Sequence, residues 1–119
     1  MLEDRLVDFA VRLIALGKYL ERDTAGRTIT AQLVRAGTSP AANYAEARSA
    51  ESRADFAHKL HIVIKELNET AVWLRIVEKA RLATHARLSL IQAECEELKR
   101  IIGASLRTTK TRAGSSHSP

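Results

Sequence analysis

Arg53 and His58, in the segment RADFAH, come nearest to a catalytic pair by residue type and spacing. A histidine can act as acid or base when the 2′-hydroxyl of RNA attacks the neighbouring phosphate, and an arginine can stabilise the charge on that phosphate. Such a spacing arises readily among 19 lysines and arginines, and Ala54 stands where helical ribonucleases of this type usually carry a polar residue. We therefore expect no enzyme and keep a metal-independent ribonuclease only as a third alternative.

His58 and His61 are three residues apart and could contact one metal ion from a single helix face. Neither belongs to the Glu-x-x-His unit that binds metal in di-iron bundles. Cys95 is the one cysteine, which excludes an internal disulfide and a cysteine cluster. We expect no metal and no cofactor, and we interpret Cys95 as a small apolar residue of the core.

Basic side chains are the remaining candidates for a functional surface. The formal net charge is +5, and a positive excess favours binding to polyanions such as nucleic acid, although a solvated charged surface is the plain alternative. The candidate nucleic-acid-binding residues are Arg12, Lys18, Arg22, Arg27, Arg35, Arg48, Arg53, Arg107, Lys110 and Arg112.

Four helices must position these side chains. Apolar residues recur at spacings of three and four in four segments. The first two cover about 2–20 and about 27–48, the third is about 28 residues long and begins after Ser52, and the fourth begins after Thr84. Ser52 and Thr84 are expected to cap the third and fourth helices. The first apolar face is predicted to contain Leu6, Phe9, Ala10, Leu13, Ile14, Gly17 and Leu20.

Short connections between such helices favour an elongated, antiparallel, up-down-up-down four-helix bundle, so the fold class is all-α. We expect residues 1–108 to form this single domain and residues 109–119, which are rich in Ser and Thr and carry basic residues without acids, to form a disordered tail. The first residues include acids rather than a signal peptide, and no apolar stretch is long enough to span a bilayer. A cytoplasmic location is therefore expected.

Pro40 lies inside the second predicted helix, where it would cost about 3 kcal/mol unless the helix bends or restarts. Thr38 or Ser39 could cap a restarted segment. We therefore expect a kink near Ser39.

Asn43 and Glu46 share a helix face that is predicted to point inward. A buried amide needs a hydrogen-bond partner, and Lys65, Glu66 or Glu69 of the third helix could supply it. We interpret Asn43, Glu46, Lys65 and Glu69 as a structural polar cluster, with a ligand site as the alternative.

The third helix carries a second apolar stripe formed by Ile62, Trp73 and Ile76. Two apolar stripes on one helix exceed what a small monomeric bundle needs. We therefore predict that these three residues lie in a subunit interface.

The stretch from Gly37 to Leu74 contains, in order, the motifs G-T-S, A-N-Y-x-E-A-R, S-R-A-D-F, H-K-L, K-E-L-x-E-T and W-L. This series resembles the bacterial four-helix-bundle family first described from open reading frames inside intervening sequences of 23S rRNA genes, and the resemblance extends weakly over about 6–110. Pro40 and Ala41 depart from it, because the family tends to have an aliphatic residue and then Gly or Pro there. The resemblance implies a ring-shaped homopentamer similar in fold to the nucleic-acid-binding accessory proteins of diversity-generating retroelements, and it establishes no catalytic role.

The sequence thus predicts a non-enzymatic, homo-oligomeric helical bundle that presents a basic surface to structured RNA or DNA without reading sequence. The alternative is a scaffold that binds a partner protein, such as a nucleic-acid enzyme. No membrane partner is expected.

Overall fold

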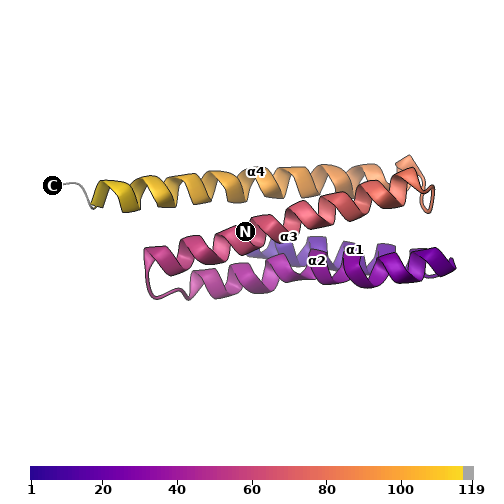
Figure 1. Cartoon of the computed structure of the whole chain (residues 1–119), viewed down its shortest axis with the longest axis horizontal. Coiled ribbons are helices and arrows are strands. Elements are labelled where there is room, and N and C mark those ends of the chain that lie inside the picture. The colour runs from indigo at the N-terminus through magenta and orange to yellow at the C-terminus, as the bar shows by residue number, and fades with distance from the viewer. Residues whose placement is uncertain (117–119) are drawn as a thin grey trace.

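The computed structural model describes residues 1–116, with side chains through residue 111. The regular secondary structure of this part of the chain is all α-helix, without a strand. The four helices are α1 (Leu2–Leu20), α2 (Thr24–Arg48), α3 (Arg53–Lys79) and α4 (His85–Ser116). They run up and down along one long axis (Figure 1), and the molecule measures 59 × 22 × 21 Å. The predicted all-α, elongated four-helix architecture is confirmed.

Side-chain caps begin three of the helices. The carboxylate of Asp23 accepts hydrogen bonds from the first backbone N–H groups of α2, the hydroxyl of Ser52 accepts one from Asp55 N–H at 3.0 Å, and the hydroxyl of Thr84 accepts one from Arg87 N–H at 3.2 Å. Such caps satisfy donors that the helix itself leaves unpaired. The predicted caps at Ser52 and Thr84 are confirmed.

The core is built from aliphatic residues of all four helices, with Phe9 and Cys95 fully buried among them. The predicted inward face of α1 is correct except at one position. Ile14 is 41% exposed, whereas Leu16 is buried in its place. Ile14 lies outside the buried face of α1 because α1 packs between α2 and α4. The buried face of α1 is turned toward α4 and does not reach Ile14.

Glycines allow α1 and α2 to approach closely. A Cβ atom on Gly37 would collide with the side chain of Leu13, and one on Gly17 would lie 2.7 Å from Cγ2 of Thr30. The hydroxyl of Thr30 donates to the carbonyl of Gly17 at 3.4 Å. The small residues at these positions therefore set the distance between the two helices.

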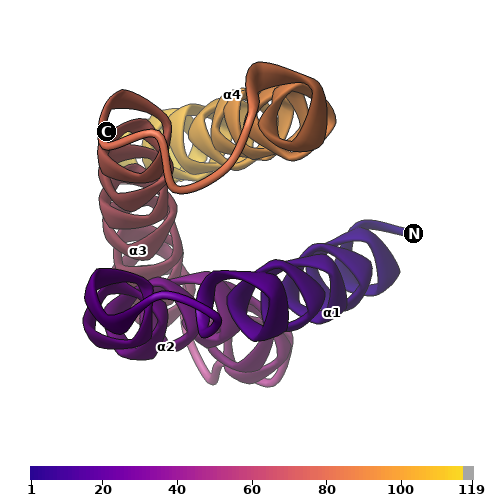
Figure 2. The same ribbon diagram turned by 90° about the vertical axis from the view of Figure 1, so that its right-hand side faces the viewer.

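The bundle follows the chain order, with α1 on α2, α2 on α3 and α3 on α4, as the end view shows (Figure 2). Helices α1 and α4 are joined by a bidentate ion pair, in which the Arg5 guanidinium donates two hydrogen bonds to the Glu94 carboxylate, at 2.7 and 3.1 Å. Two parallel hydrogen bonds of this kind fix orientation as well as distance.

One of two predictions about helix shape stays open, and the other is corrected. The helical backbone of α2 continues across Pro40, and the kink near Ser39 stays a prediction. The disordered tail was placed after residue 108, whereas α4 continues as a helix to Ser116. The hydroxyls of Thr109 and Thr111 donate to carbonyls one turn earlier, at 2.9 and 3.0 Å, so these polar residues are accommodated within the helix. Residues 117–119 lie outside the described part.

Candidate nucleic-acid interface

Tyr19 is held between two arginines where the α1–α2 turn meets the start of α4. The guanidinium carbons of Arg22 and Arg87 lie 3.8 and 3.7 Å from the centre of the Tyr19 ring. Two guanidinium groups cannot share one ring face at this distance, so they cover opposite faces. Arg22 also donates to the Tyr19 carbonyl at 3.0 Å. Two positive charges are thereby held in fixed positions by cation–π contacts.

Further basic side chains surround this stack. Arg12 and Arg87 line a hollow of about 250 Å³ between α1 and α4, and Arg22 and Arg81 line a neighbouring hollow of about 580 Å³. Lys18 lies in the last turn of α1 and is exposed. Together these side chains form what we call the basic end, which consists of Arg12, Lys18, Arg22, Arg27, Arg81 and Arg87.

Two of the acids near the basic end are engaged in local hydrogen bonds through their carboxylates. Asp23 caps α2 through its carboxylate. Glu78 bonds to Gln92 and to His85, each at 3.1 Å, and these hydrogen bonds lower the pKa of Glu78. Glu21 is exposed, and its carbonyl accepts a hydrogen bond from Arg27 at 3.5 Å. The six basic side chains outnumber the nearby acids, which also include Asp8, exposed four residues before Arg12 on α1.

The exposed side of α3 is also basic, and the sequence analysis missed it. Its solvent-exposed residues are Arg53, Ala54, His58, His61, Lys65, Asn68, Val72, Arg75, Ile76 and Lys79, with no acid among them. Lys65, Arg75 and Lys79 form what we call the α3 ridge, and in the described part of the chain none of them takes part in an ion pair. Helical spacing in the sequence could have revealed this arc, although Glu69, four residues after Lys65, lies at its edge and has its pKa lowered in part by the charge of Lys65.

Two arginines predicted to bind nucleic acid instead pair with acids of their own chain. Arg35 forms ion pairs with Glu66, at 3.3 Å, and with Glu69. Arg48 pairs with Glu3 at 3.0 Å. A carboxylate beside each guanidinium offsets its attraction for phosphate, so these two arginines add little to a polyanion-binding surface.

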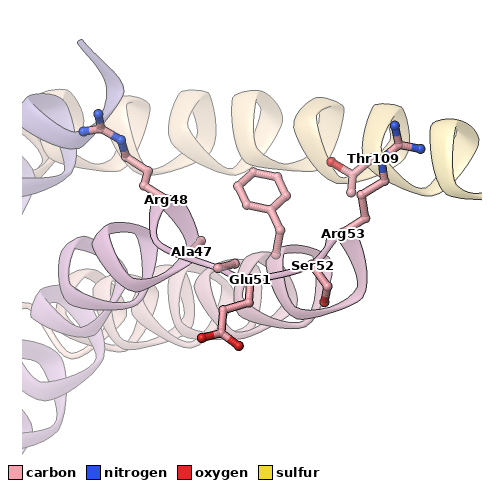
Figure 3. Close-up of a pocket in the computed structure, with 8 residues that line it drawn as sticks. Ala47, Arg48, Glu51, Ser52, Arg53 and Thr109 are labelled. Carbon is pink, nitrogen blue, oxygen red and sulfur yellow. The ribbon is translucent and has the colours of Figure 1, made fainter.

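The remaining predicted basic residues lie toward the opposite end of the molecule. Arg53 and Arg48 stand on opposite sides of a hollow of about 400 Å³ that is also lined by Phe56 and Thr109 (Figure 3). Arg107 and Lys110 are exposed on α4, and the side chain of Arg112 lies outside the described residues. The structure therefore divides the predicted basic residues between the two ends of the bundle.

The predicted polar cluster is not formed. The amide of Asn43 donates to the carbonyl and hydroxyl of Ser39, at 3.1 and 2.9 Å, within α2 itself. Glu46 pairs with Lys59 at 3.3 Å, and Glu69 pairs with Arg35. An acceptor one turn away satisfies Asn43 without any group from α3, so the expectation of an interhelical partner was wrong.

Arg53 and His58 are poorly placed to act together. Both are exposed on α3, and five residues of an α-helix turn two side chains about 140° apart. The described residues contain no group of three or more metal-ligating side chains that could hold an ion. Neither the ribonuclease pair nor a metal centre finds support in this arrangement.

The predicted interface residues lie on one flank of α3. Ile62 and Trp73 are half-buried, and Ile76 is 39% exposed. Ile62 and Trp73 lie on the side of α3 turned away from Arg75 and Lys79, whereas Ile76 lines a hollow together with these two residues. Burial of this flank by another subunit stays a prediction.

Comparisons with known proteins place the chain in a family. Residues 4–104 match the family described as 23S rRNA-intervening sequence protein. A solved structure titled as a protein with unknown function from the S23 ribosomal protein family, from Bacteroides thetaiotaomicron, is 34% identical. The match covers 89% of this chain and 98% of that one, with a TM-score of 0.85. No curated protein matches, and no helix among the described residues is long and apolar enough to cross a membrane. The chain belongs to the 23S rRNA-intervening sequence protein family.

Proposed function

We propose that this protein is a non-enzymatic, homo-oligomeric helical bundle that binds the phosphate backbone of structured RNA or DNA without reading its sequence. The observation that carries the proposal is the α3 ridge, since the exposed residues of α3 include Lys65, Arg75 and Lys79 and no acid. Arg81 of the basic end lies two residues after Lys79, the last residue of α3. The proposed binding surface consists of the ridge and the basic end.

The chemistry of this surface favours phosphate over bases. Lysine and arginine side chains neutralise phosphates and release counterions, which gives affinity without sequence information. Base stacking would need open aromatic rings, but both faces of Tyr19 are covered by arginines and Trp73 is half-buried. Backbone binding is therefore the mode that this surface supports best.

Self-assembly would multiply these contacts. In the proposed ring of five subunits, the Ile62, Trp73 and Ile76 flank is covered by a neighbour, and a bend of α2 near Ser39 adjusts the bundle to the ring. Five copies of a weak phosphate-binding surface bound to one nucleic acid act at a high effective concentration. The ring would thus convert modest affinity per subunit into stable binding.

Charge-neutralising variants test the proposal. The Arg75→Gln/Lys79→Gln variant should weaken filter-binding to a double-stranded RNA hairpin at least fivefold at fixed salt, because phosphate contacts are lost. Arg100→Gln is the matched control, since Arg100 is exposed on α4 but pairs with Glu97. Equal affinity of the wild type and the Arg75→Gln/Lys79→Gln variant would overturn the proposal.

A protein-binding scaffold is the second candidate function. It is favoured by Val72 and Ile76, which are 48% and 39% exposed and line an apolar hollow of about 440 Å³ rimmed by Arg75 and Lys79. A partner captured in a pull-down that persists after nuclease treatment, and that is lost in Val72→Asp, would support the scaffold over direct nucleic-acid binding.

A further inference from the structure

Helix α1 carries an apolar stripe on its outer side that the described residues leave exposed. Val7, Val11 and Ile14 are 45%, 57% and 41% exposed, although each is a β-branched aliphatic residue. Their spacings of four and three residues align them in one row along α1. Contiguous exposed apolar rows of this kind mark surfaces that bind a partner.

Opposite charges stand at the two ends of the same row. Asp4 precedes Val7 by three residues, and Lys18 follows Ile14 by four, so the sequence of the row is Asp4, Val7, Val11, Ile14 and Lys18. These positions follow the 3,4 rhythm of a coiled-coil seam. Asp4 and Lys18 are both exposed. Among the described groups, the Asp4 carboxylate forms an ion pair only with the N-terminal ammonium group of Met1, at 3.6 Å.

The row is complementary to a reversed copy of itself. Asp4 and Lys18 each lie seven residues from Val11, so rotation by 180° about an axis through Val11 places each acid opposite the other copy's lysine. The same rotation places Val11 opposite Val11 and brings Val7 and Ile14 of the two copies to within one residue of facing each other, since they lie four and three residues from Val11. A surface that meets its own copy in this way defines a two-fold, isologous interface.

We propose that two copies of this chain pair through antiparallel α1 helices, centred on Val11, with Asp4 of each copy bound to Lys18 of the other. The seam buries six aliphatic side chains, three from each copy, and is closed at both ends by an ion pair. The partner is a second copy rather than a different protein, because the same row of α1 provides apolar side chains that pack against its reversed copy and charges that are opposite to those of its reversed copy.

This pairing is separate from assembly through the flank of α3. The flank of α3 consists of Ile62, Trp73 and Ile76, and α3 lies diagonally across the bundle from α1, with which it makes no contact among the described residues. The two surfaces therefore do not overlap. The α1 pairing can join two single chains or two larger assemblies, and it does not depend on nucleic-acid binding.

A cysteine placed on the two-fold axis tests the geometry. The Val11→Cys variant should form an intermolecular disulfide under mild oxidation in most of the protein, because the new thiol lies opposite its own copy. Ala54→Cys is the control, since Ala54 is exposed on α3, which lies diagonally across the bundle from α1. Cys95 is buried and contributes no background. Equal cross-linking of the two variants, or none in either, would overturn the proposal.

Charge exchange tests the register. In light scattering without nucleic acid, Asp4→Lys alone and Lys18→Asp alone should each raise the dissociation constant of the pair roughly tenfold, because two ion pairs become two repulsive contacts. The double variant Asp4→Lys/Lys18→Asp should restore the wild-type value. Circular dichroism confirms that each variant is folded, since both side chains are exposed. Unchanged dissociation in the single variants, or no restoration in the double variant, would refute the antiparallel register.

Discussion

Trp73 donates its indole N–H to the carboxylate of Glu69 at 3.0 Å, one turn earlier on α3. This hydrogen bond is the main cause that lowers the pKa of Glu69, with a further contribution from Arg35. Trp73 is the only tryptophan of the chain. We therefore expect its fluorescence to follow the protonation of this carboxylate.

Tryptophan fluorescence should titrate with a midpoint below 4.5, the ordinary value for glutamate, and this transition should be absent in Glu69→Gln. Because the folded-state pKa lies below the unfolded value, ionised Glu69 contributes stability above the unfolded pKa, and this contribution is lost as the pH falls through the folded pKa. A midpoint at or above 4.5, or an unaltered titration in Glu69→Gln, would refute the assignment.

Two glycines should respond to alanine in opposite directions. Gly37→Ala should lower the free energy of unfolding by about 1–3 kcal/mol, because the added Cβ collides with Leu13 between α1 and α2. Gly103→Ala should raise it by roughly 0.5–1 kcal/mol, because the nearest atom would lie at an ordinary 3.5 Å and alanine favours the helix. Urea denaturation of both variants measures the two effects, and changes of the same sign would contradict the packing described.

Cys95 should be unreactive in the native protein. Burial is the main cause that raises the pKa of its thiol to about 12, so the reactive thiolate is scarce at neutral pH. Ellman's reagent at pH 8 should modify Cys95 only after denaturation, with native labelling at least a hundredfold slower. Labelling of the native protein at the rate of the unfolded chain would show that the core opens around α4.

The caps of α3 and α4 and most of the core could be predicted from the sequence, because each depends on residues within one or two turns of each other. Ser52 with Asp55 and Thr84 with Arg87 are local signals of this kind. The error at Ile14 arose because spacing identifies a helix face but does not specify how far that face is rotated toward each neighbour.

The candidate interface was predicted only in part, since contacts between distant residues decide which charges are available. Nothing local indicates that Arg87 covers Tyr19 or that Arg48 pairs with Glu3. The prediction of an interhelical partner for Asn43 was wrong for the opposite reason. The Asn43 amide donates to acceptors of Ser39 in the same helix and needs no group from α3. The α3 ridge could have been recognised from helical spacing alone.

Arg81 occupies a backbone position that suits glycine. Its φ angle is 58°, and the hydrogen bond from Leu82 N–H to the Val77 carbonyl, at 3.0 Å, closes α3 in a motif that commonly carries glycine there. Arg81→Gly should therefore raise the free energy of unfolding by roughly 0.5–1 kcal/mol while weakening RNA binding through loss of a charge of the basic end. Thermal unfolding and filter-binding on the same sample measure both. A less stable variant, or a stabilised variant with unchanged affinity, would contradict one half of the prediction.

The salt dependence of RNA affinity tests the central claim most directly. For a double-stranded RNA hairpin, log K should fall linearly with log salt concentration, and the slope should become shallower by about 0.7–0.9 for each phosphate contact removed. Substituting Lys65, Arg75 and Lys79 together with glutamine should therefore reduce the slope by about 2–3, whereas Arg100→Gln should leave it unchanged. Binding that is insensitive to salt, or a slope that the triple variant does not alter, would contradict the account.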